Sequence, residues 1–202
     1  MGIRQTLASQ ASDPHGPLGW IAAWIMPLQS DAHCGDLAGL LALRPEDEVL
    51  DVACGAGVFL QKRASHVRHA AGIDHSEIQI RMARKRNRDG IVAGTVEIVW
   101  GDSAALPWKD DRFSAVACNC LSCLSQPQPS LREMHRVLRP GGRVALSFDD
   151  HRDVATARRE EQKWGLPAWT EPEFRTMLEE AGFSVVSMSR AGKLAFAKAV
   201  KQ

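Results

Sequence analysis

The stretch VLDVACGAGVFL, residues 49–60, indicates the fold class of this chain. A short apolar run leads into Asp51, a turn with Gly55 and Gly57 follows, and apolar residues then resume. Glycine lets the backbone turn sharply and lie against a ligand because it has no Cβ atom. The pattern therefore predicts a buried strand, a turn that a ligand approaches closely, and the start of a helix.

Apolar strands and amphipathic helices alternate outward from this stretch, which indicates a parallel sheet covered on both faces. A capping box from Thr170 to Glu173 starts a further helix that ends at Gly182. The expected fold class is α/β: a Rossmann-like doubly wound sheet, mostly parallel, with a C-terminal antiparallel hairpin strand and an N-terminal helical lid. We expect strands over 48–53, 69–74, 94–100, 112–119, 143–148, 183–190 and 194–201, and helices over 57–67, 76–88 and 129–139.

The N-terminal part is expected to be separate from the sheet. Residues 1–16 read as a loose polar arm, and the apolar stretch 17–28 is too short to span a bilayer. That stretch suits a buried helix, a lid or a helix on a membrane surface. A second helix is predicted from Asp31 as N-cap, with Leu37, Leu40 and Leu41 on one face. The predicted organisation is an arm with lid helices over 1–44 and a ligand-binding domain over 45–202, as one structural unit.

Composition narrows the classes of function. The net charge of +1 gives no global field for nucleic acid or an anionic membrane. No stretch of 18 or more apolar residues occurs, and no apolar signal-peptide core is found near the N-terminus. Five cysteines in a chain of this size suit reduced thiols better than a disulfide framework. We therefore expect a cytoplasmic protein with no transmembrane segment.

Polar residues at three predicted strand ends point to a nucleoside. Open α/β sheets bind ligands at the carboxyl ends of their strands. Asp74 follows Gly57 by 17 residues and could accept hydrogen bonds from both ribose hydroxyls. Asp102, at the next strand end, could accept from an exocyclic amine such as that of adenine. Val58 stands where a dinucleotide fingerprint needs its last glycine, and Asp51 would repel a pyrophosphate but suits a cationic ligand.

Four motifs occur in order over roughly residues 45–150: VLDVACGAG, GIDHS, GDSAALPWKDDRFSAVAC and LREMHRVLRPGGRVALS. Together they resemble the motifs of the class I S-adenosylmethionine-dependent methyltransferases, in the branch of small UbiE-like enzymes. One departure is Ala53, where the family usually has glycine.

The resemblance implies a methyltransferase that transfers a methyl group from S-adenosylmethionine to a small-molecule acceptor and releases S-adenosylhomocysteine, with no metal. Asp51 and the backbone of 53–57 would hold the methionine part, Asp74 and His75 the ribose, and Asp102 and Ser103 the adenine. Asn119 would face the transferred methyl group, although a strand-end polar group bonded to backbone is an equal alternative. His151, after the fifth strand, is a candidate general base. The implied cofactor-binding residues are Asp51, Ala53, Cys54, Gly55, Gly57, Asp74, His75, Asp102, Ser103 and Asn119.

Some features have other interpretations. Cys118, Cys120 and Cys123 could bind zinc or a thiophilic metalloid, but small packing residues are the favoured interpretation. The basic run 81–88 could grip phosphates, but it suits a solvated helix face better. An RNA methyltransferase, a nicotinamide oxidoreductase and a cofactor-binding or pericyclic relative without methyl transfer are the rivals. The acceptor, its reacting atom and the oligomeric state are left open.

Overall fold

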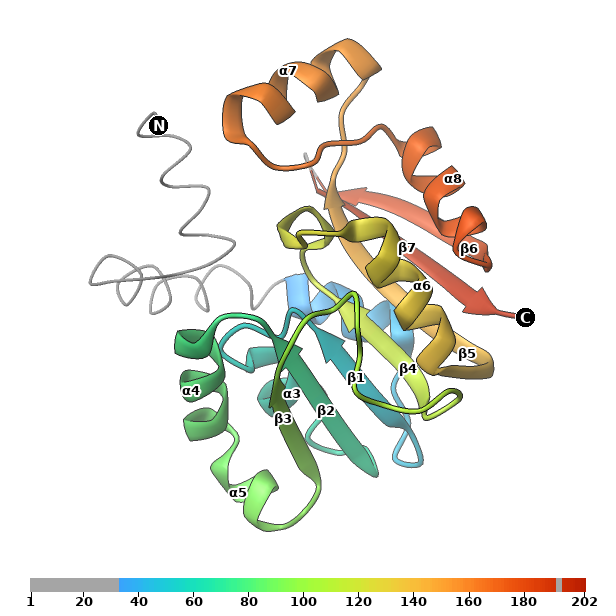
Figure 1. Ribbon diagram of the computed structural model, residues 1–202. Coiled ribbons are helices and arrows are strands. Elements are labelled where there is room, and N and C mark those ends of the chain that lie inside the picture. Colours follow the sequence, from blue (N-terminus) through green and yellow to red (C-terminus); the bar gives the residue numbers. More distant parts are fainter. Residues whose placement is uncertain (1–32, 192–193) are drawn as a thin grey trace.

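The computed structural model describes residues 33–191 and 194–202. Among these residues, seven strands form one sheet in the order β3-β2-β1-β4-β5-β7-β6 (Figure 1). Strands β3, β2, β1, β4 and β5 are parallel, and β7 runs antiparallel to both β5 and β6. The predicted doubly wound sheet with a C-terminal antiparallel hairpin is therefore confirmed. The strands are β1 Glu48–Val52, β2 His69–Asp74, β3 Val96–Trp100, β4 Phe113–Cys118, β5 Leu138–Asp149, β6 Phe183–Ala191 and β7 Leu194–Lys201.

Helices cover both faces of the sheet, as continuous apolar strands require. Helices α6 (Pro127–Val137) and α8 (Glu171–Glu180) pack on one face, where Leu131 and Phe174 are fully buried (Figure 1). Helices α3 (Val58–Lys62) and α4 (Glu77–Arg86) contribute Phe59 and Ile80 to the cluster on the other face. The predicted capping box opens α8: Thr170 accepts a bond from the Glu173 N–H, and Glu173 accepts one from the Thr170 N–H.

Residues 33–41 are helical, and Leu37 and Leu41 of this helix are fully buried. They belong to the same cluster as Phe59 and Phe196. This part of the expected lid region is thus a helix that covers one face of the sheet. The predicted N-cap Asp31 and the apolar stretch 17–28 lie outside the described residues. No helix among the described residues is long and apolar enough to cross a membrane.

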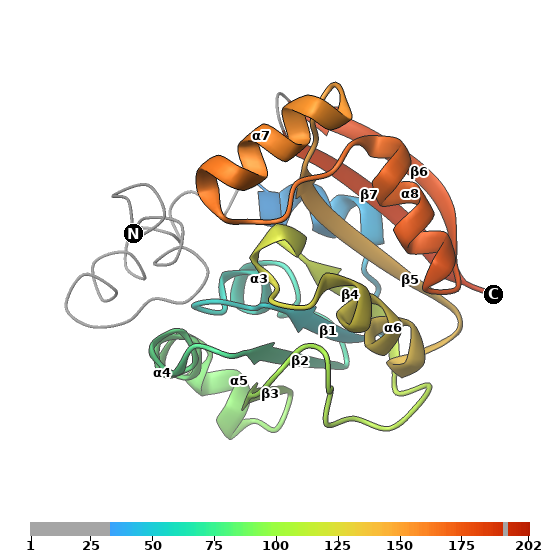
Figure 2. The same ribbon diagram turned by 45° about the horizontal axis from the view of Figure 1, so that its top comes forward.

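The structure corrects several predicted boundaries. Helix α3 ends at Lys62, five residues before the predicted end, and β5 starts at Leu138 rather than 143. The early start of β5 includes an irregular segment, since Phe113 pairs with Leu138 but Ala115 already pairs with Arg143. Two helices were not predicted: α5 (Arg88–Val92) and α7 (Val154–Trp164). Helix α7 has the sequence VATARREEQKW, which offers few large apolar residues, and it buries only Ala157. It lies apart from α4 and α5, next to α8 (Figure 2).

Candidate functional site

The glycine-rich turn follows β1 and is tied to the neighbouring strand. The Cys54 N–H donates to the Ile73 carbonyl over 3.0 Å, and the Gly57 N–H donates back to the Cys54 carbonyl over 2.9 Å. Three residues of the turn have left-handed backbone: Ala53 at φ 56°, Gly55 at φ 51° and Gly57 at φ 73°. Ala53 thus occupies a conformation that glycine adopts without strain, which explains why a glycine would suit this position.

The two glycines differ in what surrounds them. A Cβ atom added at Gly55 would meet only the Gln79 Oε1 atom, at 3.9 Å. A Cβ atom at Gly57 would lie 2.5 Å from Asn87 Nδ2 and 3.1 Å from Ala83 Cβ. The absent Cβ at Gly57 thus has a packing reason, and the use of both glycines in ligand approach stays a prediction. Gly57 allows α4 to pack against the turn, and Gly55 keeps its outer side open.

The end of α4 and the residue after it hold the turn in place. The Arg86 guanidinium donates to the Ala56 carbonyl over 2.9 Å, and the buried Asn87 amide donates to the Gly57 carbonyl over 3.0 Å. Arg84 donates to the Ile98 carbonyl, and Arg81 pairs with Glu77. Arg81, Arg84, Lys85 and Arg88 are exposed, which agrees with the solvated helix face favoured from the sequence, and Arg84 and Arg86 also bond backbone carbonyls of the domain.

Asp74, at the end of β2, is buried and accepts two backbone hydrogen bonds. The Gly55 N–H donates to Oδ2 and the Ser76 N–H donates to Oδ1, each over 2.9 Å. These bonds fix the carboxylate against the glycine turn. A carboxylate oxygen can accept more than one bond, so both oxygens keep capacity for a ligand hydroxyl.

Asp51 lies inside the sheet, beside Gly72 of β2 and Ala117 of β4. Burial raises the pKa of its carboxyl group well above the usual value, and the nearby charge of Asp74 adds to the rise. A cationic group of a ligand would favour the ionised form. The two carboxyl groups together suit a ligand that carries both a diol and a positive charge.

A cavity of about 390 Å³ opens at these strand ends. Five predicted residues line it: Ala53, Asp74, His75, Asp102 and Ser103. Five others were not predicted: Ile73, Trp100, Gly101, Leu124 and Ser125.

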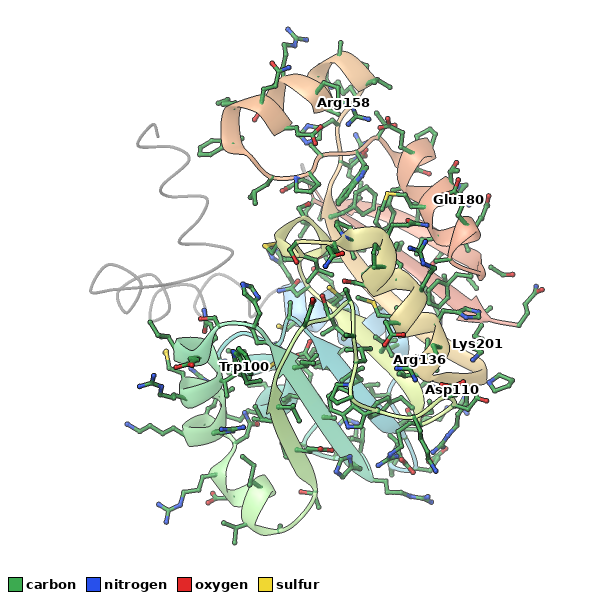
Figure 3. All side chains as sticks on the ribbon, in the orientation of Figure 1. Trp100, Asp110, Arg136, Arg158, Glu180 and Lys201 are labelled. Atoms are coloured by element: carbon green, nitrogen blue, oxygen red, sulfur yellow. A yellow bond between two sulfur atoms is a disulfide. The ribbon has the colours of Figure 1, made fainter. Side chains whose placement is uncertain are left out.

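Trp100 is the largest unpredicted lining residue. Its indole N–H donates to the His75 carbonyl over 2.8 Å, and its ring stays 58% exposed (Figure 3). An exposed tryptophan at the end of an edge strand was the signal for it in the sequence.

The loop that carries Asp102 and Ser103 is anchored to α6. Arg136 donates to the carbonyls of Leu106 and Trp108 over 3.0 and 2.8 Å, and it pairs with Asp110 (Figure 3). The pKa of Arg136 is raised, first by its hydrogen bonds to Glu133 and then by those to Asp110. The Ser103 hydroxyl is bonded to the hydroxyl of Ser130 on α6, over 2.7 Å. Helix α6 therefore positions the adenine end predicted from the sequence.

Asn119 follows β4 and does not line this cavity. Its carbonyl and its Oδ1 atom both accept from the Ser147 hydroxyl of β5, the latter over 3.2 Å. This bonding favours the alternative in which Asn119 is a strand-end polar group.

His151 lines a second cavity, of about 580 Å³, beyond the end of β5. The cavity lies under α7, and none of the predicted cofactor residues lines it. Asp150 is buried at its edge and pairs with Arg190 of β6. Arg158 ties α7 to the surrounding wall, since it donates to the Ala168 carbonyl over 2.9 Å and pairs with Glu173 at 2.6 Å (Figure 3).

Two of the five cysteines are not reduced thiols, which corrects the sequence expectation. Cys120 and Cys123 form a disulfide. Cys34, Cys54 and Cys118 are buried and take no part in a disulfide. In this state the three cysteines 118, 120 and 123 do not offer three thiolates to a metal.

The fold and these strand-end carboxylates are typical of nucleoside-binding α/β domains. Comparison with known proteins finds matches among methyltransferases. A family model described as a methyltransferase domain matches residues 49–142. A 2-phytyl-1,4-naphtoquinone methyltransferase of Synechococcus elongatus is 34% identical over 137 residues, which cover 65% of this chain and 58% of that protein. An arsenite methyltransferase of Halobacterium salinarum is 33% identical over 77% of this chain and 42% of its own length.

These matches support the predicted resemblance to the class I S-adenosylmethionine-dependent methyltransferases, and the chain spans less than two thirds of the length of these two relatives. Among solved structures, the cyclase SpnF has a TM-score of 0.75 at 21% identity, with 85% of this chain and 81% of that chain covered. At that identity the likeness shows the shared fold.

Proposed function

We propose that this protein transfers a methyl group from S-adenosylmethionine to a small-molecule acceptor. One observation carries the proposal: the ends of β1, β2 and β3 bring the glycine turn, Asp74 and Asp102 around one cavity. The methyltransferase domain over residues 49–142 supports the same conclusion. The relatives named above act on small molecules, a naphthoquinone and arsenite, according to their names.

The residues present fit this cofactor. Asp74, fixed by the Gly55 and Ser76 N–H groups, would accept bonds from the ribose hydroxyls. Asp102, whose Oδ1 accepts from the Ala104 N–H over 2.9 Å, would accept from the adenine amine, with Trp100 as an outer wall. Asp51 and the 53–57 backbone would hold the cationic methionine part.

The second cavity is our proposal for the acceptor site. It lies at the same carboxyl edge of the sheet, beyond β5. Its wall combines the apolar side chains of Trp164, Leu166 and Pro167 with His151 and Arg152. Such a mixture suits an acceptor with an apolar body and a polar group.

S-Adenosylmethionine, when bound, supplies an electrophilic methyl group on a sulfonium centre and leaves as S-adenosylhomocysteine. The protein contributes mainly position, since holding two reactants in line supplies much of the acceleration of such transfers. His151 would accept a proton from an acceptor that loses one on methylation, since a neutral imidazole nitrogen can act as a general base.

Calorimetric titration with S-adenosylhomocysteine tests the cofactor site. We expect micromolar binding by wild type, a loss of about tenfold or more in Asp74→Asn (about 1.4 kcal/mol) and no change in Asp89→Asn, an exposed carboxylate of α5. Circular dichroism checks that the Asn variants are folded. Folded protein that binds NAD but neither S-adenosylmethionine nor S-adenosylhomocysteine would refute the proposal.

Methyl transfer is tested separately, because a cyclase shares this fold. Release of S-adenosylhomocysteine is followed with quinol, phenol, thiol and arsenite acceptors. With an acceptor that the wild type methylates, the Trp164→Ala variant should lose most of its turnover. The Val186→Ala variant, which changes an exposed apolar residue of β6, should keep a turnover rate near that of wild type. Activity that depends equally on both residues would overturn the assignment of the second cavity to the acceptor.

A further inference from the structure

We propose that Cys120 and Cys123 are a redox-active dithiol–disulfide pair at the wall of the cofactor cavity, and that their oxidation state sets the affinity for the cofactor. The claim about cofactor affinity rests on the proposed function, whereas the claim that the two cysteines form a redox-active pair does not. The pair closes the sequence Cys-Leu-Ser-Cys over a separation of three residues.

The bridge lies directly before two residues that line the cofactor cavity. It spans the short 3-10 helix η1 (Leu121–Cys123), which directly follows β4. The residue before the bridge is Asn119, bonded to Ser147. The two residues after it, Leu124 and Ser125, line the cofactor cavity. A change in the bridge would therefore reach the cavity wall through one or two peptide units.

The segment has anchors that do not depend on the bridge. Leu121 is fully buried and Leu124 is 5% exposed, both within one core cluster. Opening the bridge should thus loosen the turn without unfolding the domain. A bridge that closes so short a loop also constrains little of the unfolded chain, so a purely stabilising role explains it poorly.

The other cysteines are protected, which restricts thiol chemistry to this pair. Cys120 and Cys123 are half-buried, whereas Cys34, Cys54 and Cys118 are buried. Burial raises the pKa of the Cys118 thiol to about 12 and that of Cys54 well above its usual value. Because the thiolate is the reactive form, neither of these two would exchange readily with the bridge.

The reductant is a dithiol. One of its thiolates attacks a sulfur of the bridge, which gives a mixed disulfide and releases one protein thiolate. The second thiol of the reductant then displaces the remaining protein sulfur. Two electrons pass to the protein, both cysteines take up protons, and the reductant leaves as its own disulfide. An oxidant of the diamide class reverses the change.

Alkylation of the folded full-length chain tests the pair itself. After diamide treatment and removal of the reagent, we expect iodoacetamide to modify none of the five cysteines rapidly. After dithiothreitol we expect two added groups, both mapped by fragmentation to Cys120 and Cys123. Rapid alkylation of Cys120 and Cys123 in the diamide-treated protein, or equal labelling of all five cysteines after reduction, would overturn the redox pair.

Titration with S-adenosylhomocysteine tests the coupling. The reduced wild type should bind about fivefold more weakly than the oxidised form, the lower end of couplings between linked sites. The variant Cys120→Ser/Cys123→Ser should bind like the reduced form and ignore dithiothreitol, whereas Cys34→Ala should respond like wild type. Equal affinity in both redox states, or a response retained in the double variant, refutes the coupling while cofactor binding stands. A different result would be a protein whose Cys120 and Cys123 switch between thiols and disulfide but which binds no cofactor in either state. That result would refute the proposed function, and the redox pair would still stand.

Discussion

Replacing Gly57 by alanine separates two explanations for the glycine turn. Gly57 has a left-handed φ of 73°, and an added Cβ would lie 2.5 Å from Asn87 Nδ2 and 3.2 Å from Ala83 Cα. The left-handed backbone costs an L-residue about 1–2 kcal/mol. Forcing a methyl group into packed surroundings costs about 1–3 kcal/mol more. We expect Gly57→Ala to lower the free energy of unfolding by about 2–5 kcal/mol.

Gly94→Ala is the matched control. Gly94 has nearly the same φ, 72°, but no heavy atom lies within 4 Å of the added Cβ. It therefore carries the backbone cost alone, about 1–2 kcal/mol. The difference between the two variants measures the packing of the turn against α4.

Urea unfolding followed by circular dichroism supplies both free energies, and thermal unfolding checks them, since each kcal/mol shifts the midpoint by about 2–4 °C in a domain of this size. If Gly57→Ala is no less stable than Gly94→Ala, the packing argument is refuted. If Gly57→Ala is as stable as Gly94→Ala but does not bind S-adenosylhomocysteine, the result would favour the interpretation from the sequence, in which Gly57 lets the ligand approach the backbone.

Three further variants test the turn, the buried charge and the loop anchor. Ala53→Gly relieves a left-handed φ of 56° but adds freedom to the unfolded chain, so its unfolding free energy should stay within about 1 kcal/mol of wild type in urea titrations. Asp51→Asn should bind S-adenosylhomocysteine about tenfold or more weakly by calorimetry, yet be more stable near neutral pH. The raised pKa makes the folded wild type bind more protons than the unfolded chain, so wild-type stability falls as pH rises from the unfolded to the folded pKa. Thermal melts across that range should show the gap widening in favour of Asn, and a gap that narrows contradicts the sign. Arg136→Lys keeps the charge but loses the fork that holds Leu106 and Trp108, so it should lose about 1–3 kcal/mol in urea titrations and show faster proteolysis of the 101–112 loop. If that loop is cleaved in Arg136→Lys at the same rate as in wild type, the result would count against Arg136 as the anchor of the loop.

The parallel sheet was predictable because local signals agree there. The stretch 49–60 combines a buried strand with a turn, and β1, β2 and β4 are mostly apolar and buried along almost their whole length. Asp74 is the last residue of β2 and Asp102 comes two residues after the end of β3, so their meeting at one edge follows from the parallel strand direction. The capping box at Thr170 is likewise a local signal that the structure contains.

Helix α7 and the second cavity could not be predicted in this way. The helix buries one alanine, so its position depends on ties such as Arg158 to Glu173 and not on an apolar face. The bridge between Cys120 and Cys123 also had no decisive signal, since the same spacing suits free thiols.

The sequence by itself determined which residues stand at the strand ends, because the extent of a strand and the side-chain types at its end are local properties. The tertiary structure alone decided what those residues face. Gly57 meets Asn87, Arg86 holds the Ala56 carbonyl, and Arg136 fixes the loop that carries Asp102. These contacts join residues about 30 positions apart or come from packed helices, and no periodicity along the chain records which side chain will fill a given space.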